Sequence, residues 1–236
     1  MSDSTPVHAL IPAAGRSVRF GGTTLKQYAH LLGMPVISHS IEAVSKCPAV
    51  ASVTVALAAD DGIFDELVQP DWPSVRTAIG GDSRAQTVLN GLRSIMAAEP
   101  DCEWVLVHDA ARPCLSQASL HRLLEEGLAS KHGAILAVPV NDTLKWAGDD
   151  GCIERTVDRS RLWAAQTPQL FRVWELAANL QAALDAGLRP TDEAAAMERA
   201  GIQPLLVEGS PTNIKVTGVD DLSLAEFILQ QQRIRE

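Results

Sequence analysis

The sequence predicts an α/β fold with a mostly parallel, Rossmann-like sheet, flanking helices and an inserted β-hairpin arm. Short apolar runs alternate with helical patterns over most of the 236 residues. Such alternation is typical of strand–helix–strand repeats, which place parallel strands side by side and helices on both faces of the sheet. The alternation breaks once, near residue 140, where two strand-like runs surround a turn. No repeat, low-complexity tract or linker is visible, so we expect residues 1–236 to form one domain.

The strands are predicted from continuous apolar runs, which are the pattern of strands buried on both faces. These runs are residues 7–11, 53–57, 75–79, 104–107 and 134–138. Three amphipathic segments lie between them, with apolar residues recurring every three or four positions. Their apolar stripes consist of Ile37, Ile41 and Val44; of Val88, Leu92, Ile95 and Met96; and of Leu120, Leu123, Leu124 and Leu128.

The predicted arm covers about residues 140–160. Two strand-like runs, 142–147 and 152–157, flank Gly148-Asp149-Asp150-Gly151, and these turn residues tolerate the positive φ that a tight hairpin needs. Four further elements are expected after the arm: a helix with Leu176, Leu180 and Leu184, a helix at 193–200, a strand at 214–216, and a closing helix with Leu222, Ala225 and Ile228.

The composition is that of a globular protein, with 46% hydrophobic and 21% charged residues. The formal net charge of −9 argues against non-specific binding to nucleic acid or to an anionic membrane. An anionic substrate would therefore need a local cluster of cations and backbone N–H groups. The four cysteines are scattered, and the first residues lack the basic and apolar regions of a signal peptide. No apolar run approaches the roughly 18 residues of a membrane span, so we expect a cytoplasmic protein with reduced thiols.

The first predicted strand leads into a loop of small residues, which begins Pro12-Ala13-Ala14-Gly15. Loops at the carboxyl ends of parallel strands bind ligands in open α/β sheets, and small residues let backbone N–H groups approach phosphate oxygens. Arg19 and Lys26 add two cations that would offset the charge of a triphosphate. Neither the P-loop pattern GxxxxGK[ST] nor the dinucleotide fingerprint GxGxxG is present. A solvated surface loop is the alternative interpretation of this segment.

Pro12-Ala13-Ala14-Gly15, Arg19 and Lys26-Gln27-Tyr28 together resemble the opening signature of the sugar-nucleotidyltransferase superfamily. More narrowly, they resemble the 2-C-methyl-D-erythritol 4-phosphate cytidylyltransferase family. The resemblance implies that Pro12, Ala13, Ala14 and Gly15 bind the phosphates of CTP. It also implies that Arg19 and Lys26 stabilise the charge of the transition state. The chain departs from the family pattern at Ser17, where a glycine is usual, and at Leu25, where a proline is frequent.

Two further segments resemble the CTP side of the family. In residues 80–88, Asp82 or Ser83 would cap a helix by propensity alone. The resemblance implies in addition that Gly81 and Asp82 contact the cytosine and that the Thr87 hydroxyl supports them.

His108-Asp109-Ala110-Ala111-Arg112-Pro113 matches the HDAARP motif of the family. The match implies CTP contacts from Asp109 and Ala110, with Mg²⁺ or another divalent cation beside Asp109. Mg²⁺ prefers few carboxylates together with phosphate oxygens and waters. We expect His108 to be structural, because the reaction implied needs no base.

The segments that resemble the acceptor side of the family extend from the HDAARP motif to residue 217. The resemblance implies acceptor contacts from Arg112, Thr143, Thr167 and Thr191, and it places Thr167 in a substrate-side loop at 163–169. It implies that the arm interlocks two subunits of a homodimer and carries Arg159 into the acceptor pocket of the partner. It also implies that Lys215 binds the acceptor phosphate close to the CTP phosphates.

The function implied is that of a nucleotidyltransferase domain covering residues 1–236. It would transfer CMP from CTP to 2-C-methyl-D-erythritol 4-phosphate, release pyrophosphate and form 4-diphosphocytidyl-2-C-methyl-D-erythritol in the non-mevalonate isoprenoid pathway. The nucleophile is already anionic, so catalysis would depend on positioning and charge stabilisation. Three alternatives stay open: a cytidylyltransferase for a pentitol phosphate such as ribitol 5-phosphate, a non-catalytic nucleotide-binding module, and a nicotinamide-dependent dehydrogenase, which the missing GxGxxG disfavours.

Overall fold

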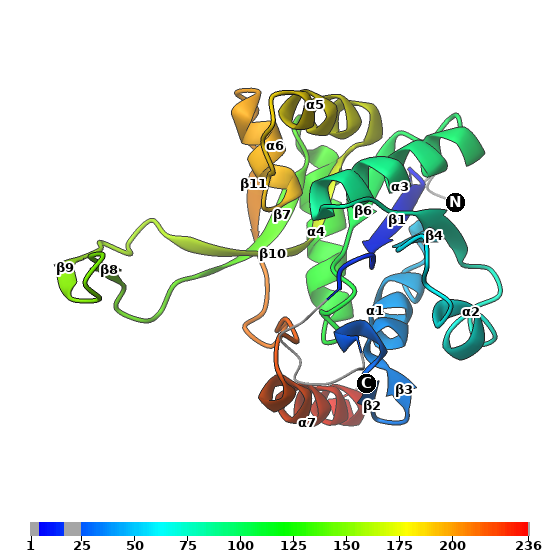
Figure 1. Cartoon of the computed structure of the whole chain (residues 1–236), viewed down its shortest axis with the longest axis horizontal. Helices are drawn as coiled ribbons and strands as arrows, with labels where there is room; N and C mark the ends of the chain where they lie inside the picture. The colour runs from blue at the N-terminus through cyan, green and yellow to red at the C-terminus, as the bar shows by residue number, and fades with distance from the viewer. Residues whose placement is uncertain (1–4, 17–24, 236) are drawn as a thin grey trace.

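The computed structural model describes residues 5–16 and 25–235 (Figure 1). Within these residues the central sheet has seven strands, in the order β11-β7-β10-β6-β1-β4-β5. The strands are β1 (Val7–Pro12), β4 (Val50–Leu57), β5 (Arg76–Ile79), β6 (Trp104–Val107), β7 (Ala134–Pro139), β10 (Trp163–Arg172) and β11 (Leu205–Glu208). β10 is antiparallel to β6 and β7, and the other pairings of this sheet are parallel. The predicted α/β class with a mostly parallel sheet is confirmed.

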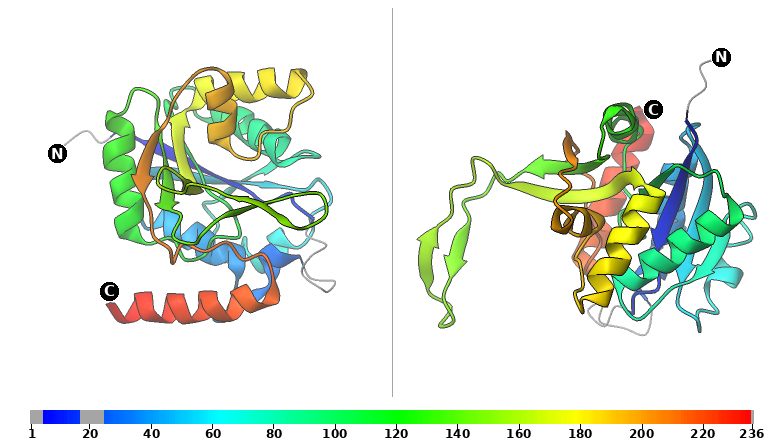
Figure 2. Two further views of the ribbon diagram at one scale, coloured as in Figure 1. Left: turned by 90° about the vertical axis from the view of Figure 1, so that its left-hand side faces the viewer. Right: turned by 90° about the horizontal axis from the view of Figure 1, so that it is seen from above.

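Helices cover both faces of the sheet (Figure 2). On one face α1 (Val36–Ser45), α2 (Phe64–Leu67) and α4 (Gln117–Ala129) bury their apolar stripes against the strands. On the other face α3 (Arg84–Ala98), α5 (Val173–Asp185) and α6 (Glu193–Arg199) do the same. The central strands β1 and β6 are buried along almost their whole length, which explains their continuous apolar runs.

A third and smaller apolar cluster is built around the closing helix, α7 (Val219–Arg235). It packs near the short strands β2 (His30–Leu31) and β3 (Met34–Pro35), which follow the 3₁₀ turn η2 (Lys26–Tyr28). No described helix is both long enough and apolar enough to cross a membrane.

The predicted hairpin is present as β8 (Lys145–Ala147) and β9 (Ile153–Thr156), paired antiparallel. It extends well beyond the sheet, at the far end of the chain segments that leave β7 and return to β10 (Figures 1 and 2). Lys145 Nζ donates to Thr156 Oγ1 at 2.7 Å across the pair. Trp146 and Ile153 are 55% and 65% exposed, so among residues 5–16 and 25–235 nothing outside the arm covers these two apolar side chains.

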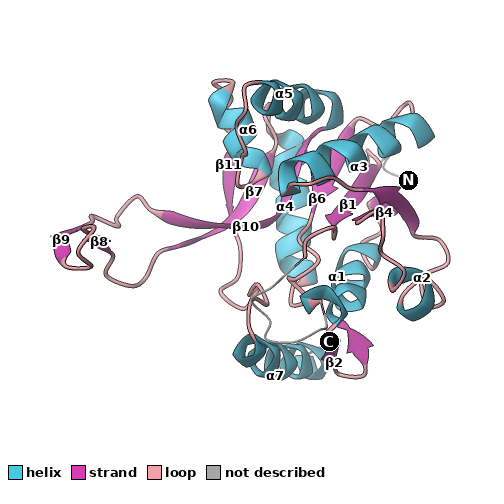
Figure 3. Cartoon of the chain, in the orientation of Figure 1, coloured by secondary structure: helices cyan, strands magenta, loops and turns pink. Residues whose placement is uncertain are grey.

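Two predicted elements are wrong. Residues 214–216 form no strand but a loop between β11 and α7 (Figure 3). Val216 N–H donates to Ala111 O at 2.7 Å, whereas a strand needs a repeated ladder of such bonds. Residues 163–169, predicted as a loop, belong to β10. The register with β7 is irregular between Ala165 and Gln169, the stretch of the strand that contains the polar residues Gln166 and Thr167.

Candidate active site

A cavity of about 670 Å³ lies where the loops after β1, β4, β5 and β6 meet. The carboxyl ends of parallel strands lie at the same edge of a sheet, which is where open α/β sheets bind ligands. Eleven of the predicted site residues line this cavity: Pro12, Ala13, Ala14, Gly15, Lys26, Gly81, Asp82, Thr87, Asp109, Ala110 and Lys215. The remaining lining residues are Arg16, Gln27, Ala58, Ala59, Asp60, Gly80, Ser83, Arg84 and Ala111.

The loop after β1 is held by contacts that the sequence did not indicate. The buried side chain of Gln27 donates from Nε2 to Ala13 O at 3.1 Å and to Gly15 O at 3.4 Å. The loop also lies directly against the loop after β5. A Cβ added to Gly80 would lie only 2.6 Å from Ala14 Cβ, which shows how closely the two loops approach. Small residues at both positions therefore let the two backbone loops form one wall of the cavity.

The N-terminus of α3 forms the next part of the wall. Ser83 caps the helix, and its hydroxyl accepts from Gln86 N–H at 3.1 Å. The buried Thr87 hydroxyl accepts from Gly81 N–H and donates to Gly81 O, both at 3.1 Å. Thr87 thus fixes the backbone of Gly81 at the cavity, and the first turn of α3 brings N–H groups without helical partners to the same place.

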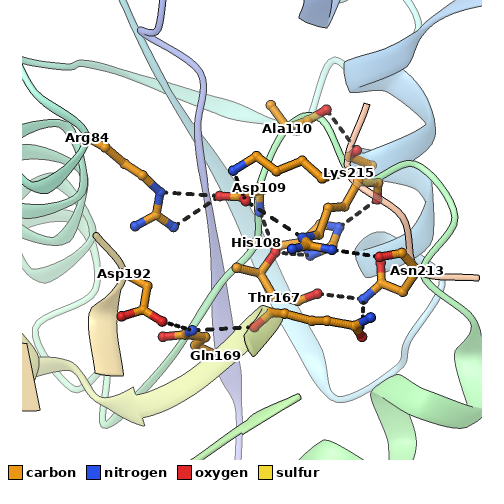
Figure 4. Close-up of polar contacts among 12 residues, drawn as sticks. Arg84, His108, Asp109, Ala110, Thr167, Gln169, Asp192, Asn213 and Lys215 are labelled. Atoms are coloured by element: carbon orange, nitrogen blue, oxygen red, sulfur yellow. Dashed lines mark hydrogen bonds and ion pairs between the residues drawn. The ribbon is translucent and has the colours of Figure 1, made fainter. Parts of the chain in front are cut away.

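Asp109 lies at the centre of a cluster of cations (Figure 4). Lys215 Nζ lies 2.8 Å from Asp109 Oδ2, and Arg84 donates from Nη2 and Nε to Asp109 Oδ1 at 3.0 and 3.3 Å. Arg112 Nε is 3.7 Å from Asp109 Oδ2. Burial alone would raise the pKa of this carboxyl, but Arg84, Lys215 and Arg112 outweigh it and hold the pKa well below its usual range. Asp109 is therefore an ionised carboxylate at neutral pH.

The orientation of Asp109 is also set from its backbone. Thr167 Oγ1 accepts from Asp109 N–H at 2.9 Å and donates to His108 Nδ1 at 3.2 Å. His108 Nε2 donates to Arg112 O at 3.0 Å. Burial lowers the pKa of His108 to about 4, so the ring is neutral at physiological pH with both nitrogens bonded inside the protein. The acceptor contact predicted for Thr167 stays a prediction, and in this structure its hydroxyl is engaged with Asp109 and His108.

The other predicted acceptor residues do not line this cavity. Arg112 borders Asp109 and donates from Nη1 to Asn213 O at 2.7 Å, and Thr191 is exposed just before α6. Thr143 and Arg159 are exposed residues of the arm, which extends away from the sheet (Figure 1), and neither residue lines the cavity. Arg19 lies outside the described residues.

Sequence reasoning missed two charged residues at this site. Arg84 contacts Asp109 and also donates from Nη1 and Nη2 to Glu193 Oε1 and Oε2 at 2.6 and 3.0 Å. Glu193 is fully buried and begins α6, directly after the helix cap Asp192. In the sequence, Arg84 and Glu193 are recognisable only as residues at the starts of helices. Their pairing spans 109 positions of sequence and leaves no local signal.

The described part of the chain contains no group of three or more His, Cys, Asp or Glu side chains that could hold a metal ion. The donor set at the cavity offers a single carboxylate, Asp109. One carboxylate suits Mg²⁺ that takes its other ligands from phosphates and waters.

Comparison with known proteins gives one consistent result. The family model described as 2-C-methyl-D-erythritol 4-phosphate cytidylyltransferase matches residues 7–231. The chain is 50% identical over 228 residues to a protein of that name from Xanthomonas campestris pv. campestris (strain B100), covering 94% of this chain and 84% of the relative. It is 47% identical over 234 residues to one from Shewanella amazonensis, covering 98% and 97%.

Solved structures agree with the sequence comparison. A crystal structure of 4-diphosphocytidyl-2C-methyl-D-erythritol synthase superposes with a TM-score of 0.83 at 39% identity, covering 95% of this chain and 98% of the other. The 2-C-methyl-D-erythritol 4-phosphate cytidylyltransferase from Francisella tularensis superposes with a TM-score of 0.79 at 33% identity, covering 94% and 99%.

Proposed function

The chain belongs to the 2-C-methyl-D-erythritol 4-phosphate cytidylyltransferase family, and we propose that the cavity around Asp109 is the site of its reaction. The chain is a nucleotidyltransferase of the non-mevalonate isoprenoid pathway. It transfers CMP from CTP to 2-C-methyl-D-erythritol 4-phosphate, releases pyrophosphate and forms 4-diphosphocytidyl-2-C-methyl-D-erythritol. The observation that carries the proposal is the ionised Asp109, buried at the carboxyl edge of the sheet between Lys215 and Arg84.

CTP binds along the wall formed by the loops after β1 and β5. The backbone of Pro12, Ala13, Ala14 and Gly15 faces the phosphates, and Lys26 at the same wall neutralises part of their charge. Gly81 and Asp82 face the cytosine, with Thr87 holding the Gly81 backbone in place. Asp109 and Ala110 contact the ribose and the adjoining phosphates.

The reaction is an attack by a phosphate oxygen of the acceptor on the α-phosphorus of CTP. The new P–O bond forms as the bond to the β-phosphate breaks, and pyrophosphate leaves with the electron pair. The nucleophile is anionic near neutral pH, so no residue has to remove a proton. Arg19 and Lys26 stabilise the negative charge of the transition state, while Arg159 and Lys215 orient the acceptor phosphate.

Mg²⁺ or another divalent cation is proposed beside Asp109. The cation would neutralise charge on the triphosphate when bound. Lys215 Nζ lies 2.8 Å from Asp109 Oδ2. A divalent cation bound to this carboxylate would compete with the lysine, and the lysine would then be available to bind a substrate phosphate.

Two subunits are proposed to form a homodimer through the arm. The exposed Trp146 and Ile153 give the arm an apolar surface that its own chain leaves open. Thr143 and Arg159 lie on this arm, outside the cavity of their own chain, and would act in the cavity of the partner. We place the enzyme in the cytoplasm, in keeping with its free cysteines.

The function is tested by pyrophosphate release from CTP and Mg²⁺, with 2-C-methyl-D-erythritol 4-phosphate and ribitol 5-phosphate compared as acceptors. We expect a strong preference for the methylerythritol phosphate, and a preference for ribitol phosphate would move the chain to the pentitol alternative. Lys26→Ala should lower turnover by about 10²–10³ while leaving a folded dimer. Near-normal turnover would refute the role of Lys26.

The dimer is tested by mixing two inactive variants, Lys26→Ala and Arg159→Ala. If Arg159 acts in the partner's cavity, a mixed dimer has one site with both substitutions and one intact site. Random exchange makes half of the dimers mixed, so about a quarter of wild-type activity should return. No recovery after subunit exchange would show that Arg159 acts within its own chain.

A further inference from the structure

We propose that Arg84 and Glu193 form a positioning pair, which sets the orientation of Asp109 and links the nucleotide side of the site to the acceptor side. The pair rests on the proposed function, because its effect is exerted through Asp109. Arg84 is the first residue of α3, and Glu193 is the first residue of α6. The two helices lie on the same face of the sheet, and this pair joins their N-terminal ends.

The geometry of the Arg84 side chain is that of a bridge. One edge of the guanidinium donates to both oxygens of Glu193, at 2.6 and 3.0 Å, while Nη2 and Nε also donate to Asp109 Oδ1. A planar fork with five N–H groups can hold two carboxylates in this way, and a lysine ammonium cannot. Burial alone would lower the pKa of Arg84, but Glu193 and Asp109 outweigh it and raise the pKa above its ordinary value.

Glu193 is placed to act on Arg84 and not on a substrate. Its side chain is fully buried, and it is not among the residues that line the cavity. A buried carboxylate needs a charge partner, and Arg84 supplies it. The pairing in turn restrains the rotamer of Arg84 and fixes the donors that face Asp109 Oδ1. The other carboxylate oxygen, Oδ2, is then free of Arg84 and pairs with Lys215.

The start of α6 is joined to the rest of the site by a second set of bonds. Gln169 of β10 donates from Nε2 to Asp192 Oδ2 at 3.0 Å (Figure 4). It also accepts from Ala194 N–H at 2.9 Å. Thr191, the predicted acceptor contact, directly precedes this anchored turn. A shift of Asp109 or Arg84 on binding CTP would therefore be transmitted through Glu193 to the acceptor side of the site.

The test is a double-mutant cycle that combines Glu193→Gln with Asp109→Asn. Glutamine keeps the shape of the side chain but removes its charge, and Arg84 retains Asp109 as a partner, so the fold should persist. If Glu193 acts only through Asp109, Glu193→Gln lowers kcat/KM about tenfold in the wild-type background and has little further effect once Asp109 is Asn. The same cycle is measured as CTP affinity by calorimetry without acceptor.

Arg84 supplies the second arm of the test. Arg84→Met should lower kcat/KM by about 10², with Arg84→Lys in between, since lysine keeps the charge but cannot bridge two carboxylates. Arg93→Met is the matched control: Arg93 lies on the same helix and donates to Gln181 of α5 at the surface, so its loss should leave kcat/KM unchanged.

The outcomes separate this inference from the proposed function. If the fold-changes caused by Glu193→Gln and Asp109→Asn multiply in the double variant, both in kcat/KM and in CTP affinity, the two residues act independently and the positioning pair is overturned. Wild-type protein that releases no pyrophosphate with CTP and 2-C-methyl-D-erythritol 4-phosphate would overturn the function, and the affinity cycle would still decide the pair.

Discussion

Replacing Thr167 by valine tests the internal bonding around Asp109 directly. The substitution keeps the shape of the side chain but removes a hydroxyl that is engaged on both sides. Asp109 N–H loses its acceptor at 2.9 Å, and His108 Nδ1 loses its donor at 3.2 Å. All three residues are buried, so water cannot replace the missing partner without rearrangement.

The expected cost follows from these two contacts. A buried polar group left without its hydrogen bond costs about 1–3 kcal/mol, so the loss of both contacts in Thr167→Val should destabilise the fold by about 2–6 kcal/mol. With a urea dependence of about 2–3 kcal/mol per molar, the unfolding midpoint should fall by about 1–2 M. Turnover should fall as well, because Asp109 loses the bond that fixes its backbone.

Urea unfolding followed by circular dichroism, with pyrophosphate release in parallel, measures both effects. Thr167→Ser is the matched control: it keeps the hydroxyl and gives up one methyl group, at a cost of about 0.8 kcal/mol. If Thr167→Val unfolds at the wild-type midpoint and changes only the KM of the acceptor, the hydroxyl serves the acceptor and the reasoning from internal bonds is refuted.

Three further predictions address other parts of the molecule. Gly133→Ala should fail to fold or lose more than about 3 kcal/mol, because its φ is +72° and a Cβ would lie 2.1 Å from Leu170 O. Gly151→Ala, with φ +78° and open space around it, should cost only about 1–2 kcal/mol when both variants are measured by urea unfolding; equal losses would contradict the steric argument. Lys215→Met should lower pyrophosphate release by about 10²–10³ in a folded protein, whereas Lys46→Met, which removes a surface pair with Glu42, should leave the rate unchanged; similar rates for the two variants would exclude the role of Lys215. Burial lowers the pKa of His39, so below pH 6.5 the unfolded chain binds more protons and the free energy of unfolding should fall toward pH 5, by at most about 1.4 kcal/mol per pH unit from this group. His39→Gln, which keeps a donor for Leu31 O, should show a shallower decline, and an unchanged pH dependence would rule out His39 as a source.

Much of the architecture could be predicted from the sequence because the information is local. A strand buried on both faces has to be apolar along its length, so residues 104–107 were predicted with the bounds of β6. The hairpin was predicted because its turn residues indicate a reversal of the chain, whatever the hairpin packs against. The small residues before Gly15 and those after His108 were placed at a ligand edge, since parallel strands end on the same side of the sheet.

Polar residues that serve distant partners could not be predicted in this way. The family resemblance placed Gln166, Thr167 and Gln169 in a loop, yet they lie in β10, where Asn213, Asp109 and Asp192 satisfy their polar groups. The apolar residues Ile214 and Val216 predicted a strand, yet in the described part of the chain no strand pairs with them.

The sequence by itself determined the class of fold, eleven of the twenty residues that line the cavity and the resemblance that identifies the family. Only the tertiary structure decided that Asp109 is held by Arg84 and Lys215, and that Arg84 in turn is bound by Glu193. The physical reason is that apolar periodicity is written along the chain, one element at a time. A buried charge takes its partner from whichever helix the folded chain brings beside it, and nothing local to either residue records that choice.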